Sequence, residues 1–182
     1  MRIVDLKYMF GYQKIIKVDD KLYRGSAVFT PVRAARLKMR GVEQIIDLRG
    51  GKKGSSFLKS LEHLYCKILN IKYINIPLSF SEKSIPKDSS FKKVLKILSK
   101  DSSKTFIHCH YGRHRTGECV FLYQKKNNQK EEEMLRGLLN NGWNKKEDFQ
   151  ENNYQSLLLF LKKYLPNKKS LEIVEQYRKP FI

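Results

Sequence analysis

The sequence predicts an α/β fold: a central, mostly parallel sheet of about four to five strands, with helices on both faces. Short apolar segments typical of buried strands alternate with longer amphipathic segments typical of helices, and the last third of the chain is helical throughout. There is no internal repeat and no long Gly/Ser/Pro-rich linker. We therefore expect one domain over residues 1–182, with a core at roughly 20–165 and a basic helical tail at 166–182.

The strand pattern occurs at four places in the chain. Each is a short run of apolar or β-branched residues bounded by turn residues or by the end of a helical pattern. The predicted strands cover residues 22–24, 42–48, 72–76 and 105–109.

Helices are predicted between and after these strands. Thr30 and Pro31 begin the first helix well, because a hydroxyl can cap it and proline has no N–H to leave unpaired, and Gly41 ends it. Ser55 or Ser56 begins the second, whose apolar face is predicted to hold Phe57, Leu61, Leu64, Tyr65 and Ile68. Later helices are expected after the loop at 77–88, with Phe91, Val94, Leu95 and Leu98 on one face, and then from Arg115 to about Lys126, at 131–140 and at 154–165.

The chain is strongly basic, with 37 Lys and Arg against 18 Asp and Glu, a formal net charge of +19. Such a surface attracts anions such as nucleic acid, acidic membranes or heavily phosphorylated small molecules. The lysines occur in pairs along the whole chain and form no block, so the charge alone identifies no partner. Nucleic acid is accordingly a less favoured partner than an anionic, phosphorylated substrate, and the oligomeric state is left open.

Three cysteines, Cys66, Cys109 and Cys119, form neither an even set nor a metal-binding spacing. This argues against a disulfide framework and favours a reducing compartment, so a cytoplasmic location is expected. No apolar run approaches the roughly 18 residues of a membrane helix. Asp5 and Lys7 interrupt the segment where a signal peptide would be apolar, although a signal peptide removed beforehand would leave no trace.

The most informative segment runs from His108 to Gly117, with the sequence HCHYGRHRTG. A strand ends at Cys109, a tight turn passes through Gly112, and a helix begins near Arg115. Backbone N–H groups in such a turn point toward one centre, and the helix N-terminus adds partial positive charge. The segment therefore predicts a cradle for a phosphate group, with phosphate-binding residues at His110, Tyr111, Gly112, Arg113, His114 and Thr116.

The same field favours the thiolate of Cys109, whose pKa should lie well below the roughly 8.5 of a free thiol. Cys109 is the candidate nucleophile. Arg115 can bind two phosphoryl oxygens through its planar guanidinium. Thr116 can donate a hydrogen bond to the sulfur when a phosphocysteine is hydrolysed.

A His-Cys pair, five residues and then Arg-Thr-Gly resembles the signature loop of the protein tyrosine and dual-specificity phosphatase superfamily. The resemblance extends to Leu22-Tyr23-Arg24-Gly25-Ser26 and to Gly41-Val42-Glu43-Gln44-Ile45-Ile46-Asp47-Leu48-Arg49, which are similar to the opening of small bacterial and atypical dual-specificity-like phosphatases. It covers roughly residues 20 to 125. It implies a phosphatase that forms a phosphocysteine and needs no metal or other cofactor.

The loop at 77–88 departs from the family pattern, which places an aspartate general acid directly after the third strand. Only Glu82 and Asp88 lie within reach here. Asp88 is the candidate acid, but it also stands where the next helix needs an N-cap. If neither residue acts, the enzyme would prefer leaving groups that need little protonation, or would use water or another side chain.

The basic residues His110, Arg113 and His114 resemble those of relatives that act on inositol polyphosphates, inositol pyrophosphates or phosphoinositides. An inositol polyphosphate is therefore the favoured substrate. The alternative is that some of these side chains face solvent or hydrogen-bond to the loop backbone and do not bind the substrate. Other functions that remain open are a protein tyrosine or dual-specificity phosphatase, an RNA 5′-triphosphatase and an inactive phosphate-binding module.

The cysteines have other conceivable roles. Zinc binding by His108, Cys109 and His110 is disfavoured, because adjacent residues on a strand point in opposite directions. Cys119 is predicted to be helix packing. Some relatives protect the nucleophile with a disulfide, which implies a minor alternative in which Cys66 pairs with Cys109.

Overall fold

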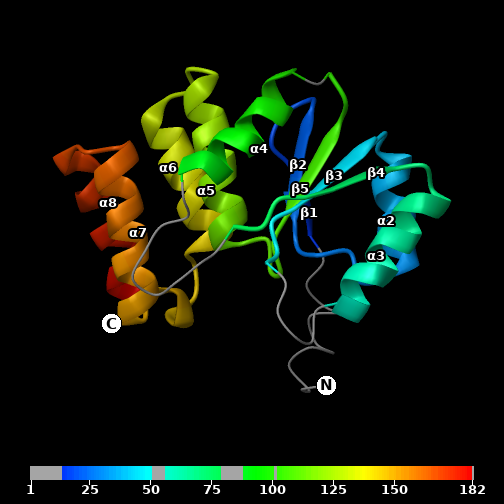
Figure 1. Ribbon diagram of the computed structural model, residues 1–182. Coiled ribbons are helices and arrows are strands. Elements are labelled where there is room, and N and C mark those ends of the chain that lie inside the picture. Colours follow the sequence, from blue (N-terminus) through cyan, green and yellow to red (C-terminus); the bar gives the residue numbers. More distant parts are fainter. Residues whose placement is uncertain (1–13, 51–55, 79–87, 101, 182) are drawn as a thin grey trace.

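The predicted fold class is confirmed by a computed structural model, which describes residues 14–50, 56–78, 88–100 and 102–181 (Figure 1). Five strands form one sheet in the order β1-β2-β5-β3-β4. The strands are β1 (Ile15–Lys17), β2 (Leu22–Gly25), β3 (Gln44–Asp47), β4 (Lys72–Asn75) and β5 (Thr105–His108).

The strands β2, β5, β3 and β4 are mutually parallel, and β5 lies at the centre of the sheet. Their register aligns the carboxyl ends: His108 of β5 is opposite Gly25 of β2 on one side and Asp47 of β3 on the other. Ligands of open parallel sheets bind at this edge. The residue that follows His108 is Cys109, so the fold places it at the middle of that edge.

Strand β1 is absent from the sequence-based prediction. It pairs antiparallel with β2, so that Ile15 lies opposite Gly25 and Lys17 opposite Tyr23. The strand has only three residues, and none of them is fully buried. The sequence therefore shows no alternation of buried and exposed residues that would indicate a strand.

Helices cover both faces of the sheet (Figure 1). The helices α2 (Pro31–Met39) and α3 (Ser56–Ile68) lie on one face, over a core that includes Leu37, Ile45 and Phe106. On the other face α4 to α8 enclose a larger core. These helices are α4 (Asp88–Lys100), α5 (His114–Lys126), α6 (Glu131–Gly142), α7 (Glu151–Tyr164) and α8 (Lys168–Arg178), with the short helices η1 (Lys146–Phe149) and η2 (Lys179–Phe181).

The start of α2 follows the sequence prediction. The Thr30 hydroxyl accepts a hydrogen bond from the Arg33 N–H at 3.3 Å, and Pro31 occupies the first turn. Gly41 follows the helix with φ of +77°, a conformation that glycine adopts without strain.

The predicted apolar face of α3 is wrong in part. Phe57, Leu64 and Ile68 are exposed, and the helix buries Glu62 and Cys66 instead. Glu62 forms ion pairs with His108 and Arg49 beneath the sheet edge, and these pairs orient the helix. A pattern of apolar residues cannot reveal a face whose centre is a buried carboxylate.

Among the described residues, none of the helices combines the length and the apolarity that a membrane span requires.

Candidate active site

The loop that follows β5 connects the centre of the sheet to α5, as the sequence predicts. Gly112 lies in this loop with φ of +69°. A Cβ atom on this residue would lie 2.1 Å from the carbonyl oxygen of Gly25, so only glycine fits between the loop and β2. The loop is therefore pressed against the end of the neighbouring strand.

Arg24 holds the same loop from below. Its side chain is 2% exposed, and its Nη2 donates to the carbonyls of Gly112 at 2.9 Å and Arg113 at 3.2 Å. These bonds fix the two carbonyls on the side of β2, away from the N–H groups of the loop. Arg24 is not among the predicted site residues; the signal that could have found it is a charged residue within a buried strand.

The thiol of Cys109 is buried at the base of the loop. Burial alone would raise its pKa. The positive charge of Arg115 and hydrogen bonding by Thr116 and the Arg113 backbone outweigh burial and lower the pKa below its ordinary value. This direction agrees with the sequence-based expectation for a nucleophilic thiolate.

Arg115 lies in the first turn of α5, beside the thiol. Its Nη1 donates to the carbonyls of Leu48 at 3.2 Å and Leu78 at 3.4 Å, which follow β3 and β4. A pocket of about 100 Å³ lies over the loop, lined by Cys109, Tyr111, Arg113, His114 and Arg115. The structure thus brings together five of the predicted site residues.

Asp148 of η1 binds two of the predicted phosphate-binding side chains. Arg113 Nη2 donates to Asp148 Oδ2, and His114 Nε2 lies 2.8 Å from Asp148 Oδ1. Burial and the nearby charges of Arg113 and Arg115 lower the pKa of His114, whose ring also stacks on Trp143 at 4.2 Å between centroids. Two of the three basic side chains expected around the cradle, Arg113 and His114, thus contact the buried carboxylate of Asp148. No local pattern in the sequence indicates Asp148, which lies more than thirty residues further along the chain.

His110 and Tyr111 form the other side of the loop. The His110 ring contacts Phe29 and Tyr111 edge to face, at 5.4 and 4.4 Å between centroids. Tyr111 is 41% exposed at the mouth of the pocket. The ring of His110 is thus packed between two aromatic side chains beside the cradle.

A buried ionic network supports the strand end that precedes Cys109. His108 Nε2 lies 2.9 Å from Glu62 Oε1, and its Nδ1 lies 3.0 Å from the Cys109 carbonyl oxygen. Arg49 bonds both Glu62 and Asp47, and the Tyr73 hydroxyl donates to Asp47 at 2.5 Å. Burial lowers the pKa of His108, but Glu62 and Asp47 outweigh it and raise the pKa. Both ring nitrogens face oxygen acceptors, an arrangement that suits the doubly protonated, cationic ring.

Asp47, Glu62 and His108 are close enough to one another to hold a metal ion. The Arg49 guanidinium already bonds both carboxylates, and His108 supplies a second positive charge. The two cations balance the two carboxylates, so the residues form a closed ionic network rather than a cation site.

The family model described as "DSP-PTPase phosphatase fused to NAD+ Kinase" matches residues 10–156, most of the chain. The chain belongs to this family of phosphatases. A search of curated proteins found no match.

Solved structures of related phosphatases share the fold of this phosphatase. A DUF442 protein from Shewanella putrefaciens CN-32 has a TM-score of 0.63 at 15% identity, covering 91% of this chain and 98% of that one. The PP-IP phosphatase SIW14 from S. cerevisiae has a TM-score of 0.60 at 16% identity, covering 91% of each chain. P. aeruginosa TpbA in complex with pTyr has a TM-score of 0.58 at 14% identity, covering 87% of this chain and 98% of that one.

Asp88, the candidate general acid of the phosphatase, is the first residue of α4 and turns toward α7. Its Oδ1 accepts hydrogen bonds from Lys163 Nζ and from the Tyr164 hydroxyl, both at 2.6 Å. These bonds lower the pKa of the carboxyl, whereas a general acid needs a raised pKa. The placement favours a structural role for Asp88. Glu82, the other candidate acid, lies outside the described residues.

We expect Asp88→Asn to change kcat by less than about threefold, because the carboxylate is engaged with α7. The measurement is steady-state phosphate release at pH 7. A loss of about tenfold to a thousandfold would instead restore Asp88 as the proton donor.

Glu118 is a buried carboxyl that is not among the predicted site residues. It lies on α5 one turn after Arg115, it is fully buried, and neither carboxylate oxygen has a hydrogen-bond partner among the described residues. Burial, and next the negative charge of Cys109, raise its pKa to about 8, against an opposing effect of Arg115. Glu118 therefore keeps its proton at neutral pH.

This raised pKa predicts a pH-dependent stability. The native state holds the Glu118 proton while the unfolded chain releases it, so the stabilisation is complete below the pKa of a free glutamate and is lost as pH rises through about 8. The free energy of unfolding should fall by at most about 1.4 kcal/mol per pH unit in this window.

Glu118→Gln should remove that pH dependence, as measured by urea unfolding between pH 5 and 9 at intervals of roughly one unit. Glu133→Gln, at an exposed position on α6, is the matched control and should retain it. If the curves of the Glu118→Gln variant and the wild type fall in parallel, Glu118 is ionised in the native protein.

All three cysteines are buried. Cys66, Cys109 and Cys119 are all free thiols. Cys66 lies in the core beneath α2 and α3, and Cys109 lies in the core on the other face of the sheet, so the alternative of a disulfide between them is not supported. Burial raises the pKa of Cys66 to about 12 and raises that of Cys119 as well, so both stay protonated. The prediction that Cys119 is a packing residue on the inward face of α5 is confirmed.

Proposed function

We propose that the protein is a cysteine-dependent phosphatase that hydrolyses phosphate monoesters through a phosphocysteine. The Cys109 sulfur attacks phosphorus and the bond to the ester oxygen breaks. The leaving oxygen takes a proton from a water molecule and departs as the alcohol. Water then attacks the phosphocysteine, which releases inorganic phosphate and restores the thiolate. The scheme needs no metal ion.

The observation that carries this proposal is the state of the Cys109 thiol. Its pKa is lowered although it is buried, whereas Cys66 and Cys119, which are also buried, have raised pKa values. The difference comes from the groups around Cys109: the Arg115 charge and the hydrogen bonds of Thr116 and Arg113. A binding module needs a phosphate cradle but has no use for an activated nucleophile, so the inactive alternative is disfavoured.

We propose a highly anionic phosphate, such as an inositol polyphosphate, as the substrate. The support is the basic loop, the net charge of +19 and the structural likeness to the PP-IP phosphatase SIW14. The contacts of Arg113 and His114 with Asp148 weaken the argument from the loop alone.

A protein tyrosine or dual-specificity phosphatase is the second candidate. The structural likeness to TpbA in complex with pTyr favours it, as does the exposed Tyr111 at the mouth of a pocket where Asp148 already balances the charge of Arg113.

The test is phosphate release from inositol hexakisphosphate and from a phosphotyrosine peptide in parallel, with EDTA present throughout. Faster release from the inositol phosphate supports the proposed substrate, and faster release from the peptide supports the second candidate. Loss of all turnover in EDTA would contradict a metal-independent mechanism. If phosphate is released from neither substrate, an RNA 5′-triphosphate is the next substrate to assay.

A further inference from the structure

The first turn of α5 and the loop before it, residues 109–113 (the catalytic loop), carry the groups that bind the phosphate in the proposed function. Arg113 is the N-cap residue of α5, but its side chain makes no capping hydrogen bond. Short polar side chains normally hold this position by bonding to an N–H of the first turn. Such a bond would here occupy an N–H that the phosphate needs. Contacts from other elements therefore fix the start of this helix.

The backbone of Arg113 is part of the site itself. It hydrogen-bonds to the Cys109 thiol and is one of the causes that lower the pKa of that thiol. Its carbonyl accepts hydrogen bonds from the Gly117 N–H at 2.7 Å and from Arg24 Nη2 at 3.2 Å. A displacement of Arg113 would therefore change both the surroundings of the sulfur and the way in which α5 begins.

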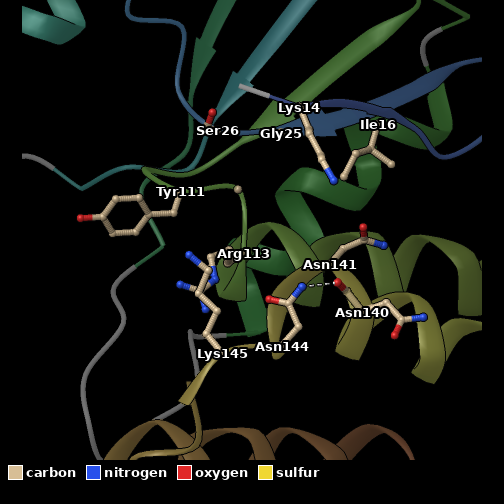
Figure 2. Close-up of a pocket in the computed structure, with 11 residues that line it drawn as sticks. Lys14, Ile16, Gly25, Ser26, Tyr111, Arg113, Asn140, Asn141, Asn144 and Lys145 are labelled. Carbon is tan, nitrogen blue, oxygen red and sulfur yellow. Dashed lines mark hydrogen bonds between the residues drawn. The ribbon is translucent and has the colours of Figure 1, made fainter. Parts of the chain in front are cut away.

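Asp148 holds the Arg113 side chain. It is 1% exposed, and both of its oxygens are engaged. Its Oδ2 accepts hydrogen bonds from the Arg113 guanidinium and, at 2.9 Å, from the Lys145 N–H, while its Oδ1 lies 2.8 Å from His114 Nε2. One carboxylate thus ties the end of the catalytic loop and the first residue of α5 to the residue before η1. Figure 2 shows Arg113 and Lys145 next to each other at this junction.

The segment that carries Asp148 is itself packed against the start of α5. Trp143 is fully buried, and its ring stacks on the His114 ring at 4.2 Å between centroids and faces Phe149 at 6.3 Å. Gly142 lies so close that a Cβ atom on it would be 3.3 Å from the Arg113 carbonyl oxygen. Residues 142–149 therefore form a packed support, against which Asp148 can hold the loop in one position.

We propose that Asp148 is a positioning residue of the active site, which binds Arg113 and His114 and thereby fixes the catalytic loop and the start of α5 in the geometry that receives the phosphate. Asp148 acts through Arg113 and does not touch the substrate. The proposal rests on the proposed function, because the geometry that it maintains is that of the Cys109 cradle. Such support matters for rate, since a displacement of about 1 Å can cost about a hundredfold.

Position and charge predict opposite results when Asp148 is replaced by asparagine. Asparagine has the same shape but only one acceptor oxygen, so it cannot hold both Arg113 and His114. If only charge mattered, removal of a negative charge near Cys109 would favour the thiolate and lower the thiol pKa. If position matters, the Arg113 backbone moves away from the sulfur and the thiol pKa rises.

The first test measures the rate of Cys109 alkylation by iodoacetamide against pH, by mass spectrometry of the peptide that contains this cysteine. In Asp148→Asn the midpoint of the profile should rise by about one pH unit, the scale of one lost hydrogen bond to the thiolate. The kcat should fall about tenfold. Glu147→Gln removes the same charge from the neighbouring, exposed position of η1 and should change neither quantity. Urea unfolding of each variant ensures that only folded protein is compared. An unchanged or lower midpoint in Asp148→Asn would overturn the proposal.

A binding measurement separates this proposal from the proposed function. Calorimetric titration of inorganic phosphate into Cys109→Ser protein needs no turnover. Addition of Asp148→Asn should weaken phosphate binding about tenfold, although the loss of a negative charge would by itself strengthen it. If binding weakens in this way while the wild type releases phosphate from neither substrate, the positioning role is supported and the proposed function is contradicted. Equal or tighter binding would refute the positioning role whether or not the enzyme is active.

Discussion

Cys109→Ser is expected to lower phosphate release by about 10⁴-fold or more, which is the scale on which removing a nucleophile acts. Serine keeps the shape of the side chain, but its hydroxyl stays protonated at pH 7, even beside Arg115. The phosphate cradle is left in place, because its N–H groups belong to the backbone and Arg24 holds the loop. Turnover and binding should therefore separate: release measured with EDTA present should be lost, while calorimetric titration should still detect inositol hexakisphosphate.

The matched control is Cys119→Ser. Cys119 is also buried and lies on α5, but its pKa is raised, so its thiol is protonated and takes no part in the chemistry. We expect this variant to keep its turnover. Activity that survives in Cys109→Ser, or binding that is lost with it, would contradict a thiolate nucleophile in a preformed cradle.

The part of the site that is contiguous in sequence could be predicted from the sequence. Cys109, Gly112 and Arg115 lie within one strand–turn–helix unit, and the physical properties of that unit follow from its own residues. Its glycine permits the turn, its backbone supplies the donors, and its helix supplies the positive end. The fold class could be predicted for a similar reason, since the alternation of strand and helix patterns is local.

The part that depends on distant residues could not be predicted. Asp148 reaches Arg113 and His114 from η1, where it balances the arginine and holds the histidine ring. Glu62 turns α3 so that part of its apolar stripe faces outward. Neither carboxylate differs from an ordinary exposed acid in a sequence read residue by residue. Only the packed structure shows that each is buried against a cation.

Arg115→Lys is expected to lower kcat by about 10³-fold, although it conserves the charge. In the native site the Arg115 guanidinium is oriented by the carbonyls of Leu48 and Leu78, which leaves its other N–H groups for the phosphoryl oxygens. Lysine has one ammonium group in place of this planar fork, so it cannot meet two equatorial oxygens at once as charge spreads over them in the transition state.

Geometry and charge can be separated in this variant by following the thiol directly. The rate of Cys109 alkylation by iodoacetamide, measured against pH, reports the thiol pKa, which Arg115 lowers mainly through its charge. Lysine should leave this pH profile close to that of the wild type while kcat falls. Arg136→Lys, an exposed arginine paired with Glu132, should alter neither quantity. A raised thiol pKa together with the loss of kcat would mean that Arg115 acts chiefly by stabilising the thiolate. A near-normal kcat would mean that the Arg115 guanidinium does not stabilise the transition state.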